Sequence, residues 1–562
     1  MTGFDADRDY IEKGSDFFEK YIMQMPIGAS VFIGAVHDFG ALVVSLRNQG
    51  QTVGDISGRV MNRRVRLLFL FVLFLALTIV LAIFGLVIAS VFRMYPSAIF
   101  PCAVQIPIAI LIGMWLHRKG VGLLLPSLAA LGVMYVSVIY GNAGMLGRMN
   151  ATMAGWSSWT WVGVLLTYSY VASVLPVWTL LQPRDYINSL QLISALGLIV
   201  VGLGVAAFAG GAVLPDGSRH DLVMVAPMVD WHPEGAPMIF PFLFITIACG
   251  AISGFHCLVS SGTSSKQLRN ERDARFVGYG GMLTEGFLAT LVILACAAGL
   301  GLGVVLEDGT VLAGREAWAS RYSSWSAAGA LSAKVSAFVD GAANLLLALG
   351  ISAGIAKALM GVLVASFAGT TLDTACRLQR YVVQELARVC TTRVSNTPNH
   401  FSPLRWLENK HGATIFAVLV AALLAAIPPA GQAWAFENAG TGGIMLWPLF
   451  GATNQLLGGL AFLVITFYLW RRGKPVWFLV LPMVFMLIMP LWAMVWQVFL
   501  GSGGSPSWVN QERWTLVVVG LATIGLEVWM IIEALIMFPR VKGVLESVAP
   551  EAPASSGMAK GT

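Results

Sequence analysis

The most informative stretch of this chain is an apolar run, FLFITIACGAISGFHCLVSSGTSS, that carries polar side chains within it. A helix would place Ser253, His256 and Ser260 on one stripe, beside a stripe of small residues that includes Gly250 and Gly254. Hydrocarbon offers no partner to such polar groups, so they are expected to face protein or a water-filled cavity. The run is therefore predicted to line a pathway through a membrane.

Two interpretations of this run stay open. In the first, its glycine-rich middle unwinds and presents backbone groups to a ligand, while His256 binds or shuttles a proton. In the second, Gly250 and Gly254 are packing positions, and the hydroxyl groups bond carbonyls of their own helix.

A second polar group lies in VASFAGTTLDTACRLQR, where Ser366, Thr370, Asp373 and Arg377 follow one helical stripe. A carboxylate at full depth in a membrane costs roughly 2 to 3 kcal/mol on insertion scales. Arg377 lies one turn from Asp373 and is expected to offset much of that cost. An interfacial ion pair and a role in ion coupling or gating are both compatible with this pattern.

The motif GAVHDF places His37 beside Asp38 in a weaker apolar run. Neighbouring residues of a helix point about 100° apart, so each side chain is expected to face a different neighbour. A titrating relay is the alternative. Further polar positions within apolar runs are Glu285, Lys357, Asn454, Gln455, Glu527 and Glu533.

The elements that must hold these residues are membrane-spanning helices. Of the 562 residues, 57% are hydrophobic and only 11% are charged, which excludes an ordinary soluble domain. A run of about 20 apolar residues crosses the hydrocarbon as a helix, and about 13 such runs occur. The chain is thus predicted to be an all-α polytopic membrane protein. The runs are 26–46, 67–91, 95–116, 121–140, 160–181, 189–214, 238–260, 276–306, 354–372, 413–427, 444–470, 476–500 and 514–538.

Lysine and arginine gather in alternate connections, as expected for loops on the cytoplasmic side. This alternation places the carboxyl terminus in the cytoplasm. We expect a charged segment at 1–25, one transmembrane domain at 26–540 with a cytoplasmic loop at 377–411, and a disordered tail at 541–562. The basic connections are 47–66, 117–119, Arg184, 266–275, 377–410, 471–474 and 540–542.

Several classes of protein lack support in the sequence. We find no nucleophile elbow, no HExxH and no Walker A loop, so an enzyme or an ATP-driven pump is not expected. The six cysteines include no CxxC spacing, which argues against a zinc site, and no cofactor or nucleic acid is predicted. A channel and a nutrient sensor remain alternatives to a carrier.

Five segments together resemble the carbon starvation protein A (CstA) family. They are GAVHDFGALVVSLRNQG, YSYVASVLPVWTLLQPRDYINS, ITIACGAISGFHCLVSSGT, SFAGTTLDTACRLQRYVVQEL and LWPLFGATNQLLGGLAF. The resemblance implies a bacterial inner-membrane secondary transporter that takes up peptides when carbon is scarce; some relatives take up pyruvate with protons. It also implies a fold related to the amino acid, polyamine and organocation transporters, with inverted repeats.

The expected function is proton-coupled import of a small peptide or pyruvate-like nutrient. The residues predicted to contact substrate or ion are Gly250, Ser253, Gly254, His256, Ser260, Thr370, Asp373, Asn454, Gln455, His37 and Asp38. One departure from the family concerns residues 1–25. Family members usually begin with extra helices and carry GHHF and GAGP segments before GAVHDF, and residues 1–25 hold nothing similar. A truncated or inactive family member is therefore the alternative.

Overall fold

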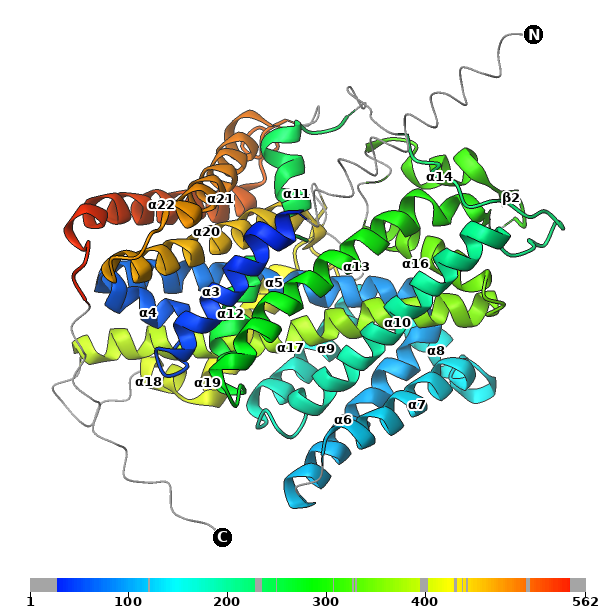
Figure 1. The fold of residues 1–562 in the computed structure, drawn as a ribbon, viewed down its shortest axis with the longest axis horizontal. Coiled ribbons are helices and arrows are strands. Elements are labelled where there is room, and N and C mark those ends of the chain that lie inside the picture. Colours follow the sequence, from blue (N-terminus) through cyan, green and yellow to red (C-terminus); the bar gives the residue numbers. More distant parts are fainter. Residues whose placement is uncertain are drawn as a thin grey trace.

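The chain folds into a bundle of long helices (Figure 1). The computed structural model describes residues 28–545 apart from 120–121, 228–234, 249, 307, 326–327, 329–330, 395–402, 429–431, 437, 441–442 and 502–505. In this part of the chain, β1 (Val304–Val305) and β2 (Val311–Leu312) are the only strands, and they pair antiparallel. The predicted segment 1–25 and nearly all of the predicted tail lie outside the described residues.

The main helices begin and end as follows. They are α3 (Ala35–Leu46), α4 (Val53–Val60), α5 (Arg63–Met94), α6 (Ile99–Lys119), α7 (Leu124–Tyr140), α8 (Gly144–Ala154), α9 (Ser158–Val174), α10 (Leu181–Ala209), α11 (Phe244–Ala248), α12 (Gly254–Gly262), α13 (Gly280–Ala297), α14 (Gly314–Tyr322), α16 (Leu331–Leu347), α17 (Ala353–Val394), α18 (Pro403–Glu408), α19 (Lys410–Ala425), α20 (Trp447–Arg471), α21 (Trp477–Val495) and α22 (Trp514–Met537). Short π-helical turns extend several of them, among them η2 (Ser30–Gly34) before α3, η4 (Ile239–Leu243) before α11, η7 (Arg275–Tyr279) before α13 and η10 (Trp496–Leu500) after α21.

Eight helical segments of the described chain are long and apolar enough to cross a membrane, which confirms a helical multi-pass membrane protein. Helices α7 and α8 would together form a ninth, but they are bent by 82°. Three apolar helices are shorter, at Ser30–Leu46, Ile239–Ala248 and Lys410–Ala425. The eight segments are Arg63–Met94, Pro96–Arg118, Leu181–Ala209, Glu271–Leu302, Ala353–Thr391, Trp447–Arg471, Trp477–Leu500 and Trp514–Arg540.

One predicted run divides differently in the structure. Residues 160–181 were expected to form a single helix, but α9 ends at Val174 and α10 begins at Leu181. Pro176 accounts for the difference, because the residue before a proline is driven out of the helical region; Leu175 is extended, with φ −65° and ψ 151°. The connection is short, and Arg184 falls inside α10 rather than in a loop.

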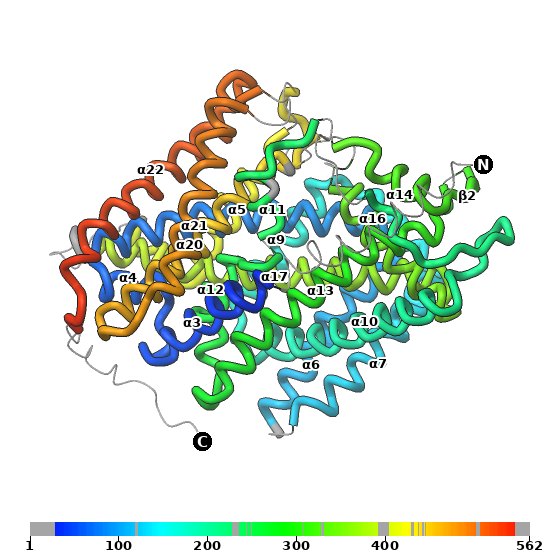
Figure 2. Tube along the Cα trace, turned by 45° about the horizontal axis from the view of Figure 1, so that its top comes forward, coloured from blue at the N-terminus to red at the C-terminus, as the bar shows by residue number. Residues whose placement is uncertain are grey.

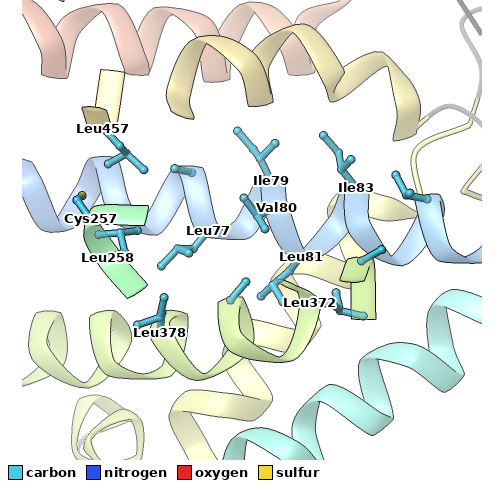
Figure 3. Packing of buried hydrophobic residues seen from close by; sticks show 14 of the residues in the cluster. Leu77, Ile79, Val80, Leu81, Ile83, Cys257, Leu258, Leu372, Leu378 and Leu457 are labelled. Carbon is cyan, nitrogen blue, oxygen red and sulfur yellow. The ribbon is translucent and has the colours of Figure 1, made fainter. Parts of the chain in front are cut away.

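Helices α5, α17 and α20 form the centre of the bundle, and α6, α7 and α10 lie towards one edge (Figure 2). The most apolar part of α20 is 89% buried, whereas that of α10 is 28% buried, so α10 lies nearer the periphery of the bundle. Figure 3 shows the core at α5, where Leu77 and Leu81 lie towards Leu372 and Leu378 of α17. In lipid such contacts stabilise by close packing rather than by removal of water.

Candidate functional site

The predicted pathway helix is broken in its middle. Helix α11 ends at Ala248, and α12 begins at Gly254, after an extended Ser253 with φ −106° and ψ 122°. The first amides of α12 therefore lack helical partners. Asn454 of α20 supplies one, since its Oδ1 accepts the Phe255 amide at 2.8 Å, and it lies 3.2–3.3 Å from the Ser253 hydroxyl. A side chain from another helix thus caps the break.

The two glycines of the break have different roles. A Cβ on Gly254 would lie 2.1 Å from the Asn454 carbonyl oxygen and 2.4 Å from the Gly458 amide nitrogen, so α12 touches the backbone of α20 there. A Cβ on Gly250 would come no closer than 3.8 Å to any neighbour, the Ile247 carbonyl oxygen. Each interpretation is met in part: Gly254 is a packing position, whereas Gly250 is not and lies in the unwound segment between the two helices.

Four titratable side chains form a continuous chain beside this break. His37 Nδ1 lies 2.7 Å from Asp38 Oδ1, and the second Asp38 oxygen lies 2.8 Å from His256 Nδ1. His256 Nε2 in turn lies 3.0 Å from Glu285 Oε2. These four side chains join α3, α12 and α13. Exposure of the side chains rises along it from 0% at His37 to 34% at Glu285.

The contact between His37 and Asp38 corrects a sequence expectation, because the two were predicted to face different neighbours. Rotation about the side-chain bonds brings the ring and the carboxylate together, and the two oxygens of Asp38 let it bridge His37 and His256. The ring of His37 also packs on Phe462, with centroids 5.0 Å apart. His37 Nε2 is buried without a hydrogen-bond partner among the described residues.

A second set of hydrogen bonds joins α3 and α12 beyond this chain. The Ser45 hydroxyl lies 3.2 Å from the Ser261 carbonyl oxygen and 3.0 Å from Ser265 Oγ. The Val53 amide donates to Ser261 Oγ at 3.2 Å. Helices α3 and α12 are therefore tied together at two levels.

Two predicted residues lie near this row of four titratable side chains without belonging to it. Ser260 is half-buried, and its hydroxyl makes no hydrogen bond to another described residue. Gln455 is fully buried, and neither its amide oxygen nor its nitrogen has a partner in the part of the chain that the structure describes. Leaving such a group unsatisfied costs about 1 to 3 kcal/mol.

Asp373 and Thr370 belong to a separate polar centre. Asp373 is fully buried and pairs with Arg184 of α10, and the Tyr168 hydroxyl donates to it at 2.7 Å. The prediction that Arg377 is its partner is wrong. Arg377 instead donates to two carbonyl oxygens near the end of α9, those of Ala172 and Leu175, because these lack helical partners.

Around this ion pair, uncharged side chains complete a hydrogen-bond network. Asn188 of α10 donates to Thr370 at 2.5 Å and accepts from Ser366 at 2.7 Å, and Gln105 of α6 bonds both Asn188 and Ser366. The network forms one wall of a cavity of about 740 Å³ whose other lining is largely apolar, including Phe92, Trp161 and Leu165.

A larger cavity, of about 1220 Å³, opens at the start of α20. Trp447, Phe450 and Ala452 line it, together with Ile245 near the break and Gln497. Ala452 is two residues before Asn454, so the cavity ends close to the cap of α12. Helix α20 ends at Arg471, in a basic connection. The cavity at its start, here called the vestibule, therefore lies at the opposite end of the helix from the basic loops.

Sequence reasoning missed five of these partners. Glu285 stood out as a polar residue in a span, but nothing in the sequence connected it to His256. Arg184 was counted as a loop residue, yet its side chain is only 4% exposed. Tyr168, Gln105 and Asn188 carried no signal beyond being polar residues in apolar runs.

These features define a class: a polytopic helical membrane protein in which a broken span brings buried titratable groups together. The comparisons with known proteins make this specific. The model of the family described as "Carbon starvation protein CstA" matches residues 22–493, and the chain belongs to that family.

Two relatives illustrate the range of the family. The Campylobacter jejuni protein named "Peptide transporter CstA" is 30% identical over 82% of this chain and 66% of its own length. The Escherichia coli protein named "Pyruvate/proton symporter BtsT" is also 30% identical, over 84% of this chain and 69% of its own length. The chain thus spans slightly less than two thirds of the Campylobacter relative.

Among solved structures, a manganese transporter from Eremococcus coleocola superposes on 92% of this chain and 96% of its own, at 11% identity and a TM-score of 0.37. A likeness at that level supports no inference about this chain.

Proposed function

We propose that this protein is a secondary active transporter that carries a peptide or a pyruvate-like acid across the membrane together with protons. The two relatives named above, a peptide transporter and a pyruvate/proton symporter, support the substrate class. The chain of His37, Asp38, His256 and Glu285 is the observation that carries the proton coupling.

The mechanism follows from which atoms face each other. A protonated His256 donates from both ring nitrogens and so binds Asp38 of α3 and Glu285 of α13 at once. While both carboxylates are ionised, a neutral ring has one donor only and gives up one of the two bonds. Binding and release of a proton at His256 therefore change how firmly α12 is held between its neighbours. A ligand that prefers one of these arrangements is then coupled to the proton.

The proposed substrate position lies at the break, next to the vestibule. Ser253 and Asn454 are buried there and bond each other, and the side-chain amide of Gln455 has no partner among the described residues. Gly250 and Gly254 let the backbone approach, and Ser260 lies one turn beyond His256. We assign Thr370 and Asp373 to the second polar centre, where they hold α17 against α10.

The membrane and orientation are part of the same proposal. Alternation of basic connections places the loops at 47–66, 266–275 and 471–474 in the cytoplasm, together with the carboxyl terminus. The vestibule at Trp447 then faces outwards. A bacterial inner membrane is the location that the family implies.

Uptake by purified protein in proteoliposomes tests the proposal. We expect labelled pyruvate or a labelled dipeptide to accumulate when the outside is acidic, and His256→Gln to reduce this uptake at least about tenfold. The reason is that hydrogen bonds to charged groups contribute about 1.5 to 3 kcal/mol each, and every 1.4 kcal/mol is a factor of ten. The matched control is His220→Gln, a histidine in the connection after α10, whose variant should transport normally.

Three results would contradict the proposal. Accumulation that ignores the pH gradient would remove proton coupling. Absence of accelerated exchange when substrate is loaded on the far side would indicate a channel instead of a carrier. Uptake of neither solute by wild-type protein would favour the inactive family member.

A further inference from the structure

A polar cleft of about 750 Å³ lies far from the broken span, between α4, the start of α5 and the end of α17. Its lining includes four arginines, Arg59, Arg63, Arg66 and Arg388, and a single carboxylate, Asp55. It sits where the spans meet the basic connections. Nothing in the proposed transport mechanism uses it.

Two of the arginines are held in place by other groups. Arg66 lies 2.7 Å from Asp55 and 2.5 Å from Glu385 of α17, and Arg59 donates to Asn48 at 3.0 Å. Gly58 contributes too, because a Cβ at that position would lie 2.9–3.0 Å from the side chain of Arg66. The guanidinium groups are therefore positioned by the fold.

The charges of the cleft do not balance. Asp55 and Glu385 are both engaged by Arg66, so Arg59 and Arg63 add positive charge that these two carboxylates do not contact. Arg63 is exposed, and its side chain makes no hydrogen bond to another described residue. It is also the first residue of the 32-residue α5, where the helix dipole adds to the positive potential.

We propose that this cleft binds a phosphate-bearing anion. Arginine groups held in fixed positions match phosphate oxygens through paired hydrogen bonds. Basic pockets between spanning helices on the cytoplasmic side bind the head groups of anionic lipids, and a soluble phosphate compound offers the same chemistry. The proposal is independent of the transport function.

The experiment uses the full chain in nanodiscs and two probes. One arm compares the unfolding midpoint and the retained lipid in discs of phosphatidylcholine with those in discs of equal parts phosphatidylcholine and phosphatidylglycerol. The other arm measures binding of inorganic pyrophosphate by calorimetry in the phosphatidylcholine discs. Retention of phosphatidylglycerol without pyrophosphate binding identifies a lipid head group, and pyrophosphate binding identifies a soluble ligand.

Variants locate the site. Arg63→Gln should weaken binding of whichever probe binds about fivefold, and Arg59→Gln should weaken it similarly, the amount expected for one basic residue at an anionic surface. Arg93→Gln, an exposed arginine at the opposite end of α5, should leave binding unchanged. Binding of neither probe by the wild-type protein would overturn the proposal, and so would Arg63→Gln and Arg59→Gln variants that bind as tightly as Arg93→Gln.

Discussion

Replacing Asp373 by asparagine should destabilise the protein far more than the same change at Asp185. Both carboxylates contact Arg184, but Asp373 is fully buried, whereas the Asp185 side chain is 43% exposed. Removing one partner of a buried ion pair costs about 3 to 5 kcal/mol, because the other charge stays behind uncompensated. Asp185 remains 2.8 Å from Arg184, so we expect the lower end, about 3 kcal/mol.

The control variant Asp185→Asn removes a partly exposed partner of the same guanidinium. Its expected cost is at most about 1 kcal/mol, because solvent screens such pairs. A third variant joins Asp373→Leu with Arg184→Met. Apolar groups of similar volume often replace a buried pair without loss, so this double variant should recover most of the stability that Asp373→Asn loses.

The assay is denaturant unfolding in one detergent, with the midpoint compared among the variants. Equal midpoints for Asp373→Asn and Asp185→Asn would refute the reasoning, since burial would then make no difference. A double variant no more stable than Asp373→Asn would also refute it, because the penalty would not come from an uncompensated charge. Uptake measured on the same samples separates this structural role from a role in ion coupling.

Three further variants test other contacts. Gly254→Ala should lower the free energy of unfolding by about 3 kcal/mol or more, the upper end for overpacking, because its Cβ would meet backbone atoms at 2.1 and 2.4 Å. The control Gly250→Ala should change the free energy of unfolding by less than about 0.5 kcal/mol. Tyr168→Phe removes a hydroxyl that donates to a buried carboxylate, so the free energy of unfolding should fall by about 1.5 to 3 kcal/mol. Glu527→Leu should raise the free energy of unfolding by about 1 to 3 kcal/mol, since both carboxyl oxygens are buried without a partner among the described residues; a lower free energy of unfolding would reveal an unrecognised partner of Glu527.

The helical fold was predictable because it depends on local composition. Apolar length sets a span, and glycine and serine within the span at 238–260 made an interruption one of two possible interpretations. The placement of Gly254 against α20 was not predictable in the same way. Whether a glycine packs or unwinds depends on which helix lies opposite, and a single sequence does not contain that information.

Partners of the charged residues were the least predictable part of the site. Asp373 was matched to Arg377 because helical spacing makes residues four apart neighbours, yet Arg184, 189 positions away in sequence, fills that role. The reason is that Arg377 has a competing set of acceptors in the last carbonyls of α9. Likewise His37 and Asp38 appeared to diverge on the helix, and only the position of His256 makes a bridging carboxylate favourable.

The double tie between α3 and α12 has a mechanical consequence. Joined through Asp38 and His256 at one level and through Ser45 and Ser261 at another, the two helices form a single lever during any rearrangement that keeps both ties. If the two helices move as one rigid unit, the chain must bend at the interruption between α11 and α12. The Asn454 side chain of α20 accepts the Phe255 amide at this hinge. Each such movement would therefore either break that hydrogen bond or move α20 as well.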